Sequence, residues 1–268
     1  MMMRRTIWMS AVAAVALGGG LACRPGGAGG AGGGGGVQQI PEPAQQLERA
    51  MAQFRRGDFR RAQLAFQRVV FELSPSQPEM AQARYYLAEC YFQNGDRVQA
   101  AAEFRKVADE FPNTEYASLA LLRAGDSNLR LWRRAELDPT YGETALAIYQ
   151  ELTGRYPDSD AAARARPHVR RLENQFADKT YKNGLFYLKR KAYDSAIIYF
   201  KDVIANFPNS QRAPDALLRL VDSYRAIRYN DELQETCLHL RRFYPNVSGL
   251  DRSCPAAPAA PATPATPS

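Results

Sequence analysis

Few side chains in this 268-residue chain have the chemistry to support catalysis or to bind a metal. There are two histidines, His168 and His239, which lie far apart in the sequence. The four cysteines are Cys23, Cys90, Cys237 and Cys254. Their spacing matches neither a Cys/His metal site nor a nucleophile with its base, and the glycine run at 32–36 lacks the Lys-Ser/Thr of a phosphate-binding loop. The sequence therefore predicts a protein that is not an enzyme and that binds no metal and no cofactor.

The cysteines also argue against a disulfide framework. If Cys23 belongs to a targeting signal, three cysteines remain, and an odd, widely spaced set is not typical of such a framework. Cys90 and Cys237 lie within helical patterns, whereas Cys254 lies in a proline-rich terminus. We therefore expect Cys90 and Cys237 to be small buried apolar residues.

The first 22 residues have the organisation of an export signal. Arg4 and Arg5 precede an apolar stretch at 6–17, and small residues follow up to Cys23. The apolar core is about a dozen residues long, whereas a helix that crosses a bilayer needs roughly 20. We therefore expect a signal peptide over residues 1–22 rather than a transmembrane anchor.

The sequence Gly-Leu-Ala-Cys at 20–23 resembles the bacterial lipoprotein signal, in which the cysteine is lipidated and becomes the mature N-terminus. It departs from the commonest form because Leu21 lies two residues before the cysteine rather than three. The resemblance implies lipidation of Cys23; a plain secretory signal and an uncleaved anchor are the alternatives. Arg24 is not the aspartate that commonly retains lipoproteins at the inner membrane, which agrees with an outer-membrane location.

Composition divides the rest of the chain into three parts. Residues 23–42, which start with the predicted lipidated cysteine, are rich in Gly and predict a flexible tether, and the Pro/Ala/Thr-rich residues 251–268 predict a disordered tail. Residues 43–250 remain for a folded domain. The net charge of +7 falls to +5 when the two arginines of the signal are removed, which is compatible with an anionic partner. Nucleic acid is not an expected partner for an exported chain.

An internal repeat occupies residues 43–250. A small residue is followed four positions later by an aromatic one, at Ala62/Phe66, Ala100/Phe104, Ala145/Tyr149, Ala196/Phe200 and, in degenerate form, Leu233/Cys237. Twelve residues after the first member of each pair stand Ser74, Pro112, Pro157, Pro208 and Pro245. This constancy indicates a repeat protein and resembles the tetratricopeptide repeat, a helix-turn-helix unit. We therefore expect an all-α superhelix of about five repeats.

Repeats three and four are longer than the others. About eight extra residues fall near 131–142, which we interpret as a loop between the two helices of repeat three. About fourteen fall within 161–191 and predict an added helical segment, because fourteen residues make nearly four helical turns. Pro167 predicts that this helix begins close to that point or bends there.

Together, these features resemble the BamD family of outer-membrane protein assembly lipoproteins. The shared features are the lipoprotein signal, five repeats, a loop with Asp138-Pro139 and a lengthened helix before repeat four. The resemblance implies a lipid-anchored protein on the periplasmic face of the outer membrane. Its implied partners are a BamA-like barrel assembly protein, other assembly lipoproteins and unfolded outer-membrane proteins. The alternative is a periplasmic repeat scaffold of the Tol-Pal or cell-division systems, but residues 24–37 lack the heptads of its coiled coil.

The first helices of such repeats line a groove that suits an extended peptide. Helical spacing predicts that six residues of repeats one and two face it: Met51, Phe54, Arg55, Tyr85, Glu89 and Phe92. We hypothesise that they bind an apolar, aromatic-ended peptide together with its carboxylate. The alternative is that Phe54 and Phe92 only pack between repeats.

A second candidate site is the loop of repeat three. It contains Arg133, Arg134 and Asp138. An insertion in a repeat array projects from the surface, so we expect this loop to contact a partner protein. The alternative is that Arg133 and Arg134 belong to a solvated helix face.

Overall fold

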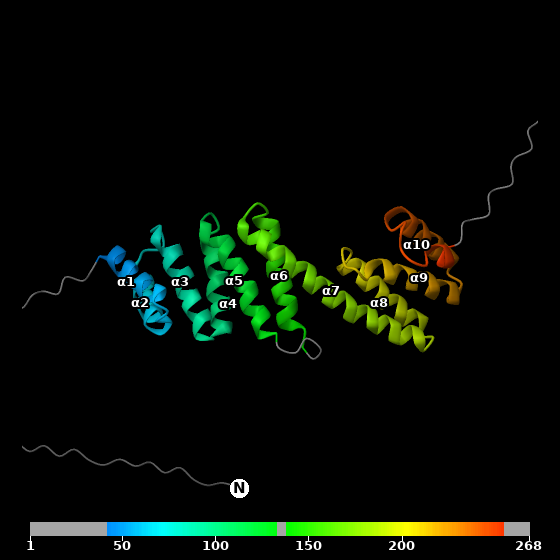
Figure 1. Cartoon of the computed structure of the whole chain (residues 1–268), viewed down its shortest axis with the longest axis horizontal. Helices are drawn as coiled ribbons and strands as arrows, with labels where there is room; N and C mark the ends of the chain where they lie inside the picture. The colour runs from blue at the N-terminus through cyan, green and yellow to red at the C-terminus, as the bar shows by residue number, and fades with distance from the viewer. Residues whose placement is uncertain (1–41, 133–137, 255–268) are drawn as a thin grey trace, which may run out of the picture. The chain divides into compact units, whose positions relative to one another are not determined.

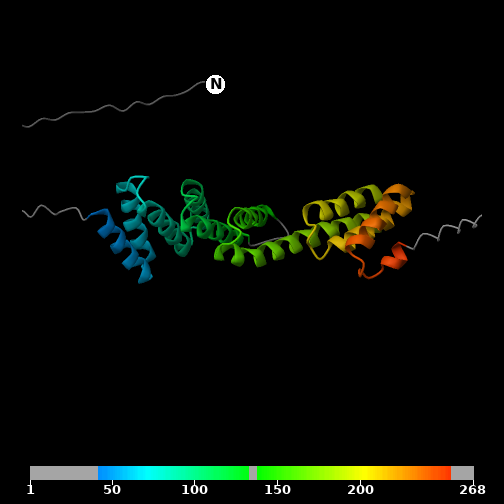
Figure 2. The same ribbon diagram turned by 90° about the horizontal axis from the view of Figure 1, so that it is seen from above.

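The computed structural model of the chain describes residues 42–132 and 138–254. These ranges hold eleven helices and no strand, and they belong to one compact unit, Pro41–Ser268. Each helix packs against the next one in chain order (Figure 1, Figure 2). The predicted fold is confirmed: this part of the chain is an all-α tetratricopeptide-repeat superhelix.

The helices form five hairpins. The first helices are α1 (Pro43–Arg55), α3 (Glu79–Asn94), α5 (Glu115–Leu131), α7 (Asp160–Lys189) and α9 (Ala213–Ile227). The second helices are α2 (Phe59–Glu72), α4 (Arg97–Glu110), α6 (Thr140–Arg155), α8 (Tyr193–Asn206) and α10 (Asn230–Phe243). A short helix, α11 (Leu250–Ser253), follows the last hairpin.

The second helices end two residues before the predicted proline positions. Helix α4 ends at Glu110 before Pro112, and α8 ends at Asn206 before Pro208. Proline cannot continue a helix and disfavours helical backbone angles at the residue before it. Phe111 and Phe207, which precede these prolines, have ψ 53° and are not helical, so the prolines fix where the second helices end. After α6, the Ser159 hydroxyl accepts a hydrogen bond from the Ala162 amide at 3.1 Å and caps α7.

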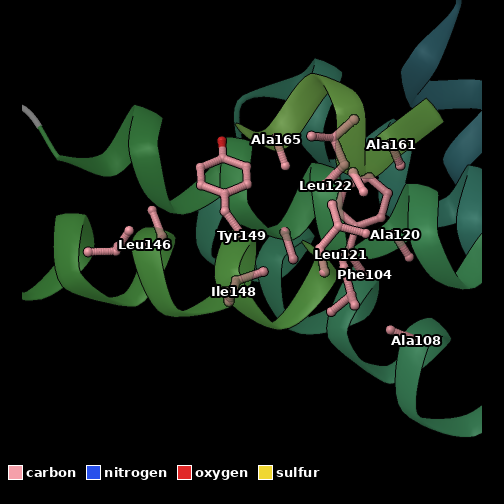
Figure 3. Packing of buried hydrophobic residues seen from close by; sticks show 14 of the residues in the cluster. Phe104, Ala108, Ala120, Leu121, Leu122, Leu146, Ile148, Tyr149, Ala161 and Ala165 are labelled. Carbon is pink, nitrogen blue, oxygen red and sulfur yellow. The ribbon is translucent and has the colours of Figure 1, made fainter. Parts of the chain in front are cut away.

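The small and aromatic residues of the repeat form the core within each hairpin. Ala62, Ala100, Ala145 and Ala196 are fully buried, as are the aromatic rings that follow them. Small residues on the first helices also receive these rings: a Cβ placed on Gly125 would lie 2.5 Å from the Tyr149 ring, and one on Gly184 would lie 2.6 Å from Phe200. Figure 3 shows Tyr149 and Phe104 among the surrounding aliphatic side chains. The absent side chain lets paired helices approach closely.

Helix α7 joins the two parts of the array. Its first half packs with α5 and α6 through Ala165 and Leu172, and its second half packs with α8 and α9 through Tyr181. The added helical segment is therefore present. It begins at Asp160, seven residues before Pro167, and runs through that proline as one element, so the helix start predicted close to Pro167 is wrong.

The prediction for the C-terminal cysteines is also wrong. Cys237 on α10 forms a disulfide with Cys254, which directly follows α11. Residues 251–254, assigned by composition to the tail, are thus tied to α10 by a covalent bond. Leu250 and Cys254 pack with α9 and α10 in one apolar cluster. Cys90 is a buried free thiol, as expected, and burial raises its pKa to about 12.

Within the described ranges, no helix is both long and apolar enough to cross a membrane. No group of three His, Cys, Asp or Glu side chains that could hold a metal ion occurs in this part of the chain.

Candidate functional site

A buried ion pair connects the first helices of repeats two and three. The guanidinium of Arg123 on α5 donates through Nη2 to the Oε2 atom of Glu89 on α3 at 2.7 Å, and its Nε donates to Oε1. Its Nη1 also lies 3.2 Å from the carboxylate of Asp126. Burial alone would lower the pKa of Arg123, but the hydrogen bonds and charges of Glu89 and Asp126 raise it. The side chain therefore remains charged and fixed between the two helices.

The network continues into the aromatic core. The Tyr85 hydroxyl donates to Glu89 at 3.3 Å, and the Tyr149 hydroxyl donates to Asp126 at 2.8 Å. The pKa of each tyrosine is raised, first by burial and then by the carboxylate it contacts. Both carboxylates therefore have donors within the protein, and Glu89, only 7% exposed, is not available to a ligand.

Three arginines surround the ring of Phe92. Their guanidinium carbons lie 4.0 Å (Arg97), 3.9 Å (Arg123) and 5.4 Å (Arg130) from its centroid. These distances are those of cation–π contacts. Arg97 at the start of α4 and Arg130 at the end of α5 thus bring two positive charges to the surface beside Phe92, next to the largely buried Arg123.

Two of these arginines lack an acidic partner. Arg123 is neutralised by Glu89, but neither Arg97 nor Arg130 forms a salt bridge within the described residues. The Nη1 atom of Arg97 is buried without a hydrogen-bond acceptor. Burial, and then the charges of Arg130 and Arg123, lower the pKa of Arg97. Because an unsatisfied guanidinium beside like charges is costly, this cluster suits an added anion.

The structure separates the six predicted groove residues into two groups. Tyr85, Glu89 and Phe92 lie together on α3 beside Arg123. Met51 is buried in the core of repeats one and two, and Phe54 contacts the rings of Phe59 and Tyr86. Arg55 is exposed, 3.8 Å from Glu48. The rings of Phe54 and Phe92 pack against neighbouring side chains, as in the alternative given for these two residues.

The predicted loop site is only partly described. Arg133 and Arg134 lie outside the described residues, as does Cys23. The side chain of Asp138 accepts a hydrogen bond from the Thr140 amide at 2.9 Å. The side chain of Thr140, and then this amide, hold the pKa of Asp138 below its usual range. The Asp138 backbone carbonyl accepts from the Trp132 indole at 2.9 Å. Asp138 thus organises the start of α6, and its role toward a partner stays a prediction.

Sequence reasoning missed the arginines of the site. A signal for one of them is present, because Leu-Leu-Arg-x-x-Asp-Ser occurs twice, at 121–127 in α5 and at 217–223 in α9. In both copies the arginine lies near the aspartate, and the serine hydroxyl donates to the arginine carbonyl at 2.7 Å. The motif places an Arg/Asp pair at equivalent positions of the first helices α5 and α9. Its recurrence could have identified Arg123 as a repeat position, which the small/aromatic pattern does not do.

Fold and site together define an all-α tetratricopeptide-repeat protein with an arginine cluster formed by α3, α4 and α5 around the ring of Phe92. A family model narrows this class. The chain belongs to the YfiO family of outer membrane lipoproteins, whose model matches residues 41–240.

Proteins similar to this chain include several named outer membrane protein assembly factor BamD. The chain is 36% identical over 95 residues to the outer membrane protein assembly factor BamD of Caulobacter vibrioides, covering 35% of this chain and 31% of that protein. It is 24% identical over 165 residues to BamD of Vibrio cholerae, covering 58% of this chain and 68% of that protein. The matched stretches thus span about a third to two thirds of these relatives.

A solved structure is similar in part as well. The crystal structure of a thermophilic tetratricopeptide-repeat protein of Thermus thermophilus covers 79% of this chain and 96% of its own, with 19% identity and a TM-score of 0.37.

Proposed function

We propose that this chain is a non-catalytic adaptor in outer-membrane protein assembly. Its partners would be a BamA-like barrel assembly protein, other assembly lipoproteins and unfolded outer-membrane proteins. Membership of the outer membrane lipoprotein family supports this, as do relatives named as outer membrane protein assembly factors. The alternative, a Tol-Pal or cell-division scaffold, has no comparable support.

The observation that carries the binding proposal is the arginine cluster around Phe92. Outer-membrane barrel chains commonly end in an aromatic residue with a free carboxylate. In our proposal Arg97 and Arg130 bind that carboxylate, and the partly exposed Tyr85 contacts the apolar end of the peptide. Phe92 is only 4% exposed, so its role is to position the arginines against its ring. Glu89 has a positioning role, because it holds Arg123 beside the ring. This revises the predicted groove, in which Arg55 was to bind the carboxylate.

The proposed location is the periplasmic face of the outer membrane, with a lipid on Cys23. The Cys237–Cys254 disulfide supports an oxidising compartment such as the periplasm, because structural disulfides are rare in the cytosol. The predicted signal peptide agrees with export. Mass spectrometry of the mature N-terminus tests the lipid directly: a diacylated or triacylated Cys23 is expected, and an unmodified chain would refute the anchor.

Peptide binding tests the site. A labelled peptide with a C-terminal phenylalanine is compared with its C-terminal amide by fluorescence anisotropy. We expect the free acid to bind more tightly, and the double variant Arg97→Gln/Arg130→Gln to weaken it by about tenfold to a hundredfold, because charged hydrogen bonds contribute about 1.5–3 kcal/mol. Arg55→Gln is the matched control and should bind like the unchanged chain. Equal binding of acid and amide would remove the proposal.

Capture from membranes tests the wider role. The lipidated chain is used to isolate partners from solubilised outer membranes. A barrel protein with periplasmic repeats is the expected partner. Recovery of Tol-Pal components without that barrel protein would instead favour the alternative function.

A further inference from the structure

The outer face of α2 combines exposed apolar and basic side chains. Phe71 is 91% exposed and Leu64 is 58% exposed, which are high values for large apolar residues. Arg60, Arg61 and Arg68 are exposed on the same helix. At about 100° per residue, all five fall within an arc of roughly 100° on the helix surface. We call these five residues the α2 outer face.

No other described helix covers this face. Helix α2 packs only with α1 and α3. Its buried residues, Ala62, Phe66 and Val69, point the opposite way, into the core of the first repeat. The packing of the array therefore does not account for the exposure of Leu64 and Phe71.

The charge of the face is little neutralised. Arg61 lies 3.3 Å from Asp58, but the Arg61 side chain is 79% exposed, so the pair is weak. Arg60 and Arg68 form no salt bridge within the described residues. Large apolar groups interleaved with arginines are typical of helices that lie on anionic membrane surfaces, since the apolar groups enter the interface and the arginines contact phosphates.

The position of the face along the chain favours a membrane over a protein partner. Only 18 residues, 24–41, lie between Cys23 and Glu42, which directly precedes α1. The Gly-rich composition of this stretch predicts an end-to-end distance of roughly 25 Å. A lipid on Cys23 would hold the first repeat within that distance of the bilayer, where even a weak surface affinity becomes effective.

We propose that the α2 outer face docks the first repeat on the anionic phospholipid surface to which the chain is anchored. The inference rests on the anchor that forms part of the proposed function. It adds a second point of attachment that orients the array, with α2 lying along the membrane. In this arrangement the lipid on Cys23 keeps the first repeat near the membrane, and the α2 outer face sets how the array is oriented on it.

Vesicle sedimentation tests this with a chain that starts at Arg24 and therefore lacks both signal and anchor. The described helices form a unit separate from residues 1–40, so this truncation leaves them intact. Vesicles of phosphatidylethanolamine with phosphatidylglycerol are compared with neutral phosphatidylcholine vesicles. We expect binding to the anionic vesicles only, decreasing as salt is added.

Two double variants probe the two kinds of side chain. Leu64→Ser/Phe71→Ser should weaken binding at least tenfold. Arg60→Gln/Arg68→Gln should weaken it by roughly fivefold for each arginine at low salt. The matched control is Ile198→Ser on α8, since Ile198 is 66% exposed but lies between Asp194 and Asp202; its binding should not change. Circular dichroism checks that each variant remains helical.

The opposing results are distinct. Equal binding to both kinds of vesicle, or equal loss in the Ile198 control, would overturn the inference. So would loss of a dimer, rather than of lipid binding, in Leu64→Ser/Phe71→Ser. If the truncated chain fails to bind anionic vesicles while Cys23 is found lipidated, the anchor stands and only the inference fails. If it binds while Cys23 is unmodified, the surface exists without the anchor.

Discussion

Arg123 on α5 donates two hydrogen bonds to the carboxylate of Glu89 on α3, and both side chains are largely buried. The pair crosses from one repeat to the next rather than lying within a hairpin. Two repeats later, the position that corresponds to Glu89, fifteen residues before the aromatic of the second helix, is occupied by Leu185. The same array thus contains both a charged and an apolar residue at this position.

The first prediction concerns the free energy of unfolding contributed by this pair. Glu89→Leu should lower it by about 3–5 kcal/mol, because the largely buried Arg123 loses its two-bond partner and keeps only the contact with Asp126. The double variant Glu89→Leu/Arg123→Met should regain most of the loss, because both members of the pair are then apolar and Asp126 still accepts from the Tyr149 hydroxyl. Urea titrations measure both changes. The pair Glu103–Lys106, in which the lysine is about half exposed, is the control, where Lys106→Ala should cost less than about 1 kcal/mol. A double variant as unstable as the single one would contradict the prediction.

The hairpins were predictable from sequence, but the site between them was only partly so. The small/aromatic spacing arises from contacts within one repeat. It therefore predicted the positions of the second helices and of the insertion in repeat three. The pairing of Glu89 with Arg123 depends on how α3 stacks on α5, which no short-range spacing encodes. Arg97 and Arg130 were missed for the same reason. Cys254 was missed because its Pro/Ala-rich surroundings have the composition of a tail.

A second prediction separates packing from helix propensity at glycines. Gly125→Ala and Gly184→Ala should each lower stability by about 1–3 kcal/mol, because the added Cβ would meet the ring of Tyr149 or Phe200. Gly154, in the last turn of α6, has no atom within 4 Å of its would-be Cβ. There, Gly154→Ala should raise stability by about 0.5–1 kcal/mol through helix propensity alone. Thermal unfolding measures all three. Stabilisation at all three positions would show that the rings yield easily.

A third prediction concerns pH. Asp178 on α7 contacts Lys182 at 2.6 Å and Arg212 at 2.8 Å, and these contacts lower its pKa against the opposing effect of burial. A lowered carboxyl pKa contributes stability above the unfolded-state value of about 4, and the contribution is lost as the pH falls through the lower folded-state value. Asp178→Asn should therefore destabilise the chain by about 0.5–1 kcal/mol at pH 7 and by progressively less below pH 4.

Urea titrations of both chains across this pH range measure the difference for Asp178. Asp194→Asn serves as the control, because Asp194 is exposed and forms no salt bridge within the described residues. Its effect should be small and constant with pH. A penalty for Asp178→Asn that grows on acidification would have the wrong sign and would contradict the assignment.

The last prediction concerns the Cys237–Cys254 disulfide, which ends the array. Two arginines hold the same segment from neighbouring helices: Arg225 donates to the Ser253 carbonyl and Arg241 to the Cys254 carbonyl. The bond closes a loop of 17 residues, so reduction should cost about 3 kcal/mol by the chain-entropy estimate. Because α10 has only one fully buried side chain, Leu240, we expect the loss to appear first as faster hydrogen exchange in α10 and α11.

Cys90→Ala should leave the effect of reductant unchanged, whereas Cys237→Ser/Cys254→Ser should abolish it. Equal loss of protection in α1 to α9 on reduction would contradict this expectation and show that the whole array unfolds as one cooperative unit.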